Sequence, residues 1–366
     1  MFGSMIWTVS EPIRMRRSLL ALALGFLLLA SSPMQAQELV YGRFADYVEA
    51  FRTQIGIPGL AAAIVGRSEV LWESGFGWQD VGRAVRMRSD TPLHLDGLTQ
   101  VFTATTVLRC VEENKLSLDD QIGLYKKDAP EPGATIRQLL THTTGTSTLS
   151  FGYRPDRIDA VAAAVKSCMG DSFRETTANM LERLAMVNSI PGPDVLALVP
   201  PAEGIPTPSE RIAYATAFDH LAVPYFVDGS RRAVQAQFAA STLTPSAGLI
   251  SSVHDYTQFD LALRSGILLD EGTLVDSWRP PVDRTGKSLP HAIGWFVQNY
   301  NGEPVVWQFG TGGEAGSSSM VVMLPLRRLS LVMMANSTGL AKSFSLEKGD
   351  VTTSPFARIF LSLFTR

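Results

Sequence analysis

The sequence predicts an α/β protein of the α+β kind. It should contain an antiparallel sheet of about five or more strands, flanked by N- and C-terminal helices, with an inserted helical subdomain. Strand-like runs lie at both ends of the chain, at 60–77 and 294–336, and a mostly helical pattern occupies 101–259 between them. The chain has 366 residues, 45% of them hydrophobic, which suffices for one large or two interleaved domains with an ample core.

The first predicted elements are a helix and a hairpin. Phe44 to Ile55 carries apolar residues at helical spacing, and Leu60 to Val65 and Val70 to Gly77 are typical of two strands joined by a polar turn. After the helical middle, Pro191 to Pro208 holds six prolines and should form an irregular loop, because proline is excluded from helix interiors.

The C-terminal third predicts an antiparallel meander followed by a helix. Short turns at Asn301-Gly302 and Leu326-Arg327 separate neighbouring strand-like runs. The last helix should pack on the sheet. The four strands and the helix are expected at Gly294 to Tyr300, Val305 to Gly310, Ser318 to Leu324, Leu329 to Asn336 and Phe356 to Phe364.

Composition excludes several classes of function. The formal net charge of −3 argues against a nucleic-acid-binding protein, which normally carries a basic excess. Two cysteines cannot build a disulfide scaffold or a cysteine-rich zinc site, and the five histidines form no H-x-x-x-H pair. We therefore expect no metal, no cofactor and no nucleic-acid partner.

The N-terminus predicts a signal peptide over residues 1–36. Three arginines precede an uncharged run from Ser18 to Leu29, and small residues follow it, with cleavage expected between Ser32 and Gln37. The run is shorter than the ~20 residues that a membrane span needs, although an uncleaved anchor is the alternative. The mature protein should be exported, periplasmic or extracellular, without a stable membrane span. Export permits a disulfide between Cys110 and Cys168, and two separate buried thiols are the alternative.

Several motifs, in the right order, resemble the serine β-lactamase and penicillin-binding DD-peptidase superfamily, especially its class C-like serine hydrolase branch. The resemblance runs from about Val40 to the C-terminus. It implies a β-lactamase-like domain over 37–366, with a sheet part at about 37–96 and 245–366 and a helical subdomain at about 97–244. The motifs are Gly75-Phe76-Gly77, the TIRQLLTHTTG stretch of 135–145 (TIRHLLTHTSG in the family), the GLISSVHD stretch of 248–255, and the closing hairpin of 325–336.

The family's chemistry requires three elements. A Ser and a Lys at positions i and i+3 of a helix project from one face, so that the Lys can take the hydroxyl proton and activate the nucleophile. A Tyr in a Y-x-N motif transfers protons, and a Lys or His in a K-T-G or H-x-G strand completes the site.

In this chain the register places substitutions at all three elements. Gly97 stands for the Ser and Gln100 for the Lys, so neither a nucleophile nor a general base is present. Tyr153 matches the family Tyr, but Pro155 replaces the Asn. Gln308 replaces the ionisable residue two positions before Gly310. The acyl-serine route is therefore predicted to be lost, with none of the catalytic side chains intact.

A pocket without the reaction is the predicted outcome. The family's oxyanion hole uses backbone N–H groups, here those of Gly97 and Thr311, and these survive side-chain substitution. We expect Gly97, Gln100, Tyr153 and Gln308 to line one cleft that binds a small-molecule or peptidoglycan-like ligand.

Two other functions stay open at this stage. One is an active hydrolase that uses other residues, with Asp96 as a carboxylate at the cleft rim. For Asp96 we favour a helix cap, and for His142 a structural loop residue. The other is a structural interaction module of the cell envelope. Thr99 lies about 200° around the helix from Gly97 and should face away from the cleft.

Overall fold

The computed structural model describes residue 3 and residues 32–143, 149–313 and 316–365. By its internal contacts the chain divides into two compact units, Met1–Asp46 and Tyr47–Arg366. The predicted signal peptide lies almost wholly outside the described residues. None of the helices in the described part combines the length and apolarity that crossing a bilayer requires.

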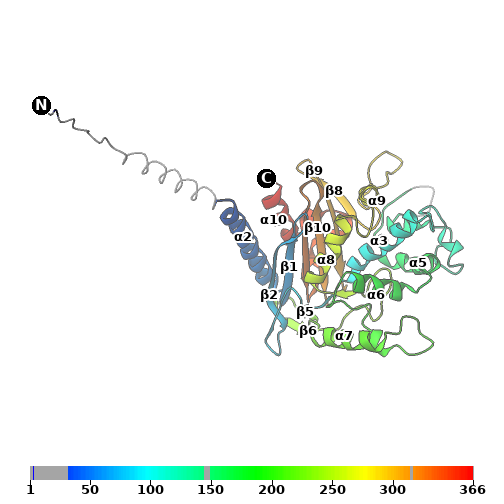
Figure 1. Ribbon diagram of the computed structural model, residues 1–366, viewed down its shortest axis with the longest axis horizontal. Coiled ribbons are helices and arrows are strands. Elements are labelled where there is room, and N and C mark those ends of the chain that lie inside the picture. The colour runs from blue at the N-terminus through cyan, green and yellow to red at the C-terminus, as the bar shows by residue number, and fades with distance from the viewer. Residues whose placement is uncertain (1–2, 4–31, 144–148, 314–315, 366) are drawn as a thin grey trace. The chain divides into compact units, whose positions relative to one another are not determined.

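A seven-stranded antiparallel sheet forms the centre of the second unit (Figure 1). Its strand order is β3-β2-β1-β11-β10-β9-β8, so strands from the two ends of the chain are neighbours. The predicted hairpin and the predicted meander are both confirmed. The strands are β1 (Gly59–Val65), β2 (Val70–Asp80), β3 (Val85–Arg86), β8 (Phe296–Tyr300), β9 (Glu303–Thr311), β10 (Ser318–Leu324) and β11 (Leu329–Ala335).

The pairing of β1 with β11 joins the two ends of the chain. Leu60 lies opposite Ala335, which in turn lies opposite Ser318 of β10. Every residue of β1 and β10 is buried, the pattern of strands covered on both faces. Helix α8 (Val253–Arg264) packs against β1 and β11 (Figure 1). The C-terminal helix α10 (Pro355–Phe364) contacts Phe51 through Phe356, with ring centroids 5.8 Å apart.

Helices and loops occupy most of the middle of the chain, as predicted. Their starts follow local sequence signals: α4, α6 and α7 each begin with a capping box, formed by Thr135, Ser172 and Thr207. The further helices that the structure describes are α2 (Ser32–Ile55), α3 (Thr99–Glu112), α4 (Ile136–Leu140), α5 (Val161–Met169), α6 (Phe173–Arg183), α7 (Pro208–Asp219) and α9 (Glu271–Ser277). Two small strand pairs accompany them: β4 (Leu93–His94) with β7 (Ile250–Ser251), and β5 (Tyr225–Val227) with β6 (Ala233–Gln235).

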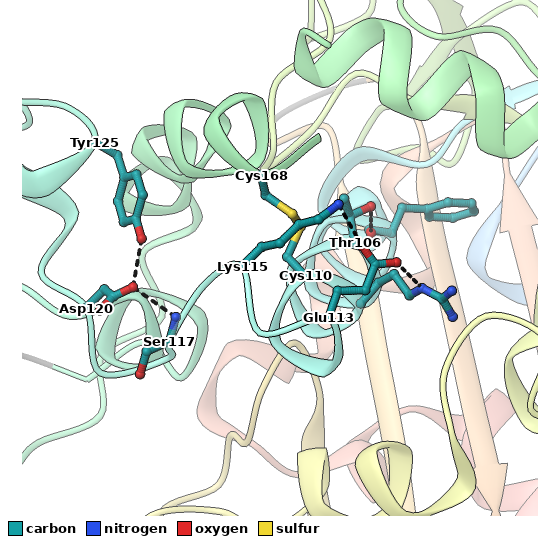
Figure 2. Close-up of a disulfide and its surroundings, with 10 residues drawn as sticks. Thr106, Cys110, Glu113, Lys115, Ser117, Asp120, Tyr125 and Cys168 are labelled. Atoms are coloured by element: carbon teal, nitrogen blue, oxygen red, sulfur yellow. Dashed lines mark hydrogen bonds and ion pairs between the residues drawn. A yellow bond between two sulfur atoms is a disulfide. The ribbon is translucent and has the colours of Figure 1, made fainter. Parts of the chain in front are cut away.

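A disulfide ties two helices of this middle region together. Cys110 of α3 bonds to Cys168 of α5, with Cα atoms 6.1 Å apart, so the two cysteines pair rather than remaining separate thiols (Figure 2). Helix α3 carries Gln100 near its start, and α5 follows the segment that carries Tyr153. The disulfide therefore fixes the relative position of the two chain segments that build the predicted site.

The turn that leads into α3 corrects one expectation. Asp96 opens the 3-10 turn Asp96–Leu98 and makes no capping hydrogen bond, so the predicted helix cap is wrong. Its backbone lies in the left-handed region at φ 47°, which directs the carboxyl inward, where Ser317 Oγ donates to Oδ2 at 2.6 Å. Burial raises the pKa of Asp96 to about 7, although the Ser317 hydrogen bond lowers it.

The disulfide yields a stability prediction. The cysteines lie 58 residues apart, and closing a loop of that size restricts the unfolded chain enough to stabilise the fold by about 4 kcal/mol. The double variant Cys110→Ser/Cys168→Ser should lose roughly that much unfolding free energy in urea. Wild-type protein unfolded in the presence of reductant should match the variant, and a difference below about 1 kcal/mol between oxidised and reduced protein would contradict the prediction.

Asp96 yields a pH prediction. Its folded pKa is raised above the unfolded value, so its stabilising contribution is full below about pH 4 and is lost as pH rises through about 7. The loss should approach about 4 kcal/mol by pH 9. Asparagine tolerates a positive φ, so Asp96→Asn should fold normally. The variant should lack this pH-dependent loss of stability and be more stable than the wild type at pH 9.

The matched control for this test is Ser317→Ala. It removes the hydrogen bond that lowers the pKa of Asp96, so the pH-dependent loss should remain and move to higher pH. Equal pH profiles of urea unfolding for wild type and Asp96→Asn would show that Asp96 does not titrate in this range.

Candidate functional site

The surroundings of Gly97, the residue predicted to stand at the nucleophile position, leave little room for a side chain. A Cβ atom built on Gly97 would be 2.9 Å from Phe309 O, 3.1 Å from Tyr153 Oη and 3.3 Å from Gln100 Nε2. All three separations are shorter than ordinary van der Waals contact. The predicted neighbourhood of Gly97, Gln100 and Tyr153 is therefore present, and the space of the missing serine is already taken up.

A chain of hydrogen bonds connects Tyr153, Gln100 and His142. Gln100 Nε2 donates to Tyr153 Oη at 3.0 Å, and Gln100 Oε1 lies 2.9 Å from His142 Nε2. On the other side of its ring, His142 Nδ1 accepts the backbone N–H of Arg154 at 3.2 Å. The loop histidine is satisfied, as the sequence predicted, and it also orients Gln100.

The direction of each bond in this chain follows from the Arg154 contact. Burial lowers the pKa of His142 to about 3, so the ring is neutral and carries one N–H. Because Nδ1 accepts, Nε2 must donate to Gln100 Oε1, and the Gln100 amide must then donate to Tyr153. Tyr153 thus keeps its own proton to donate, and among the described residues no acceptor for it is present. Burial also raises the pKa of Tyr153, so it stays protonated.

Gln308 contacts the neighbours of this group, His291 and Phe309. Its Nε2 donates to Gly294 O at 3.1 Å and lies 3.2 Å from His291 Nε2, while its Oε1 accepts from Phe309 N at 2.9 Å. His291 Nδ1 lies 2.7 Å from Ala292 O, so Nδ1 donates and Nε2 accepts from Gln308. The Gln308 amide is therefore fully engaged inside the protein and has no group left for a ligand.

Aromatic rings fill the space around these polar groups. The Tyr153 ring stacks on Phe309 at 5.2 Å and lies 5.5 Å from Phe296, and the ring of His142 meets that of His291 edge-on at 4.6 Å. Phe296 in turn stacks on Trp307 at 4.4 Å. Both histidines are buried, and burial lowers the pKa of His291 well below its ordinary value. Gly97, Gln100, His142, Tyr153 and Gln308 are called the degenerate centre, or the centre, below. The centre is thus uncharged and largely shielded from water.

The Thr311 N–H, one of the two backbone donors predicted for an oxyanion hole, makes no hydrogen bond within the described part of the sheet. Gly312 N donates to Ser317 O, so in antiparallel pairing the next pair, Thr311 with Ser318, is not hydrogen-bonded and the Thr311 N–H points away from β10. On that side β8 reaches only to Phe296, opposite Trp307. A Cβ on Gly310 would lie 2.8 Å from Gly97 N and 2.1 Å from Leu95 O, so only glycine fits there and the two donors lie close together.

Thr99, Pro155 and Asp96, the other residues weighed in the sequence, lie outside the hydrogen-bonded group. Thr99 Oγ1 accepts from Leu249 N inside the core, away from the centre as expected. Pro155 begins a 3-10 turn, Pro155–Ala160, which leads directly into α5. Asp96 is buried against Ser317 instead of reaching the rim. Sequence reasoning missed His291 and Ser317, because neither lies in a motif and both meet their partners only through the fold.

Three cavities in the part of the chain that the structure describes are lined by residues outside the centre. Among the described residues, no group of three His, Cys, Asp or Glu side chains is placed to hold a metal ion. Three cavities, of about 320, 290 and 270 Å³, are lined by residues between 105 and 268, and within the described chain none of the three is lined by Gly97, Gln100, Tyr153 or Gln308.

Comparisons with known proteins identify the family of the chain. The beta-lactamase family model matches residues 44–188 and 195–350. The protein flp of Staphylococcus aureus (strain MW2) is 24% identical over 322 residues, covering 76% of this chain and 60% of the relative. The chain thus spans about three fifths of the length of that curated relative.

Solved structures share the fold at low sequence identity. An octameric penicillin-binding protein homologue from Pyrococcus abyssi superimposes with a TM-score of 0.69 at 18% identity, covering 88% of this chain and 77% of the homologue. A class C beta-lactamase from Rhodobacter sphaeroides gives a TM-score of 0.63 at 15% identity, covering 88% and 98%. The chain belongs to the beta-lactamase family, within the superfamily of serine β-lactamases and penicillin-binding proteins.

Proposed function

We propose that this chain is an exported member of the beta-lactamase family that binds a ligand at the degenerate centre and does not hydrolyse it through an acyl-serine. The observation that carries the proposal is the hydrogen-bonded chain of His142, Gln100 and Tyr153 beside Gly97. It offers neither a nucleophile nor an effective base. Gly97 has no side chain, the Gln100 amide cannot accept a proton near neutral pH, and Tyr153 is held protonated. Both ring nitrogens of His142 are already hydrogen-bonded, and burial lowers the pKa of the ring to about 3.

What the centre offers is a set of neutral hydrogen-bond donors. They are the N–H groups of Gly97 and Thr311 and the hydroxyl of Tyr153, which suit a carbonyl or carboxylate oxygen. A small-molecule or peptidoglycan-like ligand carries such groups. Export is supported by the basic and apolar N-terminal segment and by the Cys110–Cys168 disulfide, a bond that persists in oxidising compartments.

Covalent labelling tests the loss of chemistry. Full-length protein treated with a fluorescent penicillin or a fluorophosphonate should show no covalent adduct on a denaturing gel. Weak esterase turnover is compatible with the proposal, because binding and an oxyanion hole alone can leave roughly 10³–10⁴-fold acceleration over water. Stoichiometric labelling, or turnover abolished by Asp96→Asn or His142→Ala, would instead establish an active hydrolase.

Binding at the centre is tested by thermal shift with D-amino-acid dipeptides and peptidoglycan fragments. A ligand that binds the native state raises the unfolding temperature. Tyr153→Phe should reduce the shift, since it removes one donor and leaves the ring in place. Absence of any shift would favour a structural interaction module of the envelope.

Restoring the two lost side chains gives a second prediction. Gly97→Ser/Gln100→Lys returns a hydroxyl and an amine one helical turn apart, and burial lowers the pKa of the lysine, so that it can act as a base. Because Phe309 O and Tyr153 Oη crowd the serine Cβ, the variant should lose about 1–3 kcal/mol of stability. It should be acylated slowly by an activated ester, and intact-protein mass spectrometry would detect the adduct.

Both single variants serve as controls and should remain unmodified. Deacylation should be poor, since Gln308 and Pro155 still lack the family's groups. A folded double variant without an adduct would show that the centre has been reshaped, and the proposal of ligand binding there would lose its support.

A further inference from the structure

We propose that a cavity on the other side of α3 binds a small aliphatic monocarboxylate. The cavity has a volume of about 320 Å³, within the range of small-molecule sites, and is called the α3–α6 cavity below. Its lining comes from the C-terminal half of α3, from α6 and from the segment after α8. The residues are Thr105, Thr106, Arg109, Glu113, Met169, Thr176, Asn179, Met180, Arg183, Leu184, Ile267 and Leu268.

This cavity is separate from the degenerate centre. Arg109 follows Gln100 by nine residues, which is about two and a half helical turns, so the two side chains leave α3 in opposite directions. The inference therefore does not rest on the proposed function, and each can fail without the other.

The apolar part of the lining suits a flexible aliphatic chain. It consists of two methionines, two leucines and one isoleucine, with no aromatic ring among the lining residues. Unbranched, polarisable methionine side chains adapt to ligands of variable shape. Ile267 is 67% exposed and Met169 is 40% exposed, so apolar side chains stand in solvent beside the hollow. A bound chain would cover this apolar surface.

The charges of the lining select a single negative group. Arg109 is already neutralised, because its Nε donates to Glu113 at 2.9 Å. Arg183 is exposed and forms no ion pair with any described residue, and Asn179 lies one helical turn before it on α6. The guanidinium of Arg183 and the neighbouring amide of Asn179 can together bind one carboxylate, the guanidinium through its charge and both through hydrogen bonds.

A buried polar atom in the lining also lacks a partner. Thr176 is only 5% exposed, and its hydroxyl forms no hydrogen bond within the described residues. Buried hydroxyls are normally satisfied, so a bound polar group or a water beside it would relieve the deficit. By contrast, the hydroxyls of Thr105 and Thr106 are satisfied by carbonyls of their own helix.

Titration calorimetry on the full chain with three eight-carbon probes tests the site. Octanoate should bind, 1-octanol should bind at least tenfold more weakly, and octylammonium should show no binding, because only the carboxylate pairs with Arg183. Equal affinity for octanoate and octylammonium would overturn the proposal.

Two pairs of surface variants locate the binding without disturbing the core. Arg183→Gln should weaken octanoate binding roughly tenfold or more, whereas Arg67→Gln, at another exposed arginine without an ion pair among the described residues, should leave it unchanged. Ile267→Glu should abolish binding by placing a like charge at the mouth, and Val187→Glu, at an equally exposed apolar residue that does not line this cavity, should not.

A final arm distinguishes a free carboxylate from a membrane lipid. Flotation with phosphatidylglycerol vesicles should show no association of the protein, while octanoate still binds. Vesicle association that Arg183→Gln abolishes, without binding of octanoate, would overturn the proposal in favour of a lipid headgroup. Octanoate binding that neither Arg183→Gln nor Ile267→Glu changes would place the ligand elsewhere and overturn it as well.

Discussion

The amide of Gln100 determines the character of the centre. It bridges two residues: its N–H donates to Tyr153, and its oxygen accepts from His142. Aromatic rings surround this pair of hydrogen bonds. A buried lysine at this position would carry the desolvation penalty of a charge or would have to shed its proton. A buried amide carries no such penalty, provided both ends are bonded, and both are. With an amide at position 100, the buried centre is uncharged and the amide is hydrogen-bonded at both ends.

The other substitutions fit this neutral interior. The space before Gly97 is limited by Phe309 O and Tyr153 Oη, so the glycine allows the tyrosine to approach closely. Gln308 places its amide between Gly294, His291 and its own neighbour Phe309, which completes a second set of satisfied polar groups. The amides of Gln100 and Gln308 are both hydrogen-bonded within the protein, and the Tyr153 hydroxyl keeps a proton that no described residue accepts. Removing one member of such a group would leave the others without their partners. The centre is consistent with a set of substitutions that act together.

The sequence predicted the frame well because the frame depends on local and periodic signals. Alternating and continuous apolar runs located β1, β2 and the C-terminal meander, and capping residues mark the starts of α4, α6 and α7. The family motifs set the register that brought Gly97, Gln100 and Tyr153 together. Asp96 was misjudged, because an acidic residue before a helix is usually a cap, and its left-handed backbone turned the carboxyl inward to Ser317 instead.

Contacts between distant, unpatterned residues were beyond sequence reasoning. His291 lies in the loop before β8, and nothing in its neighbours indicates that it meets His142, which is 149 positions earlier in the numbering. The pairing of Cys110 with Cys168 depended on how α3 and α5 cross, and two buried thiols were an equally reasonable expectation. Such pairings arise from tertiary packing, which no single-sequence pattern encodes.

Helix α3 connects the features of this protein. Its first turn holds Gln100 at the neutral centre, Cys110 near its end is tied to α5, and Arg109 on the opposite side borders the α3–α6 cavity. The disulfide lies beside that cavity, since Met169, which lines it, follows Cys168 directly. A crosslink at this point restrains the walls of the cavity and the position of the Tyr153 segment together. The position of α3 therefore matters twice, because the centre that holds Gln100 and the cavity bordered by Arg109 are both built on this one helix.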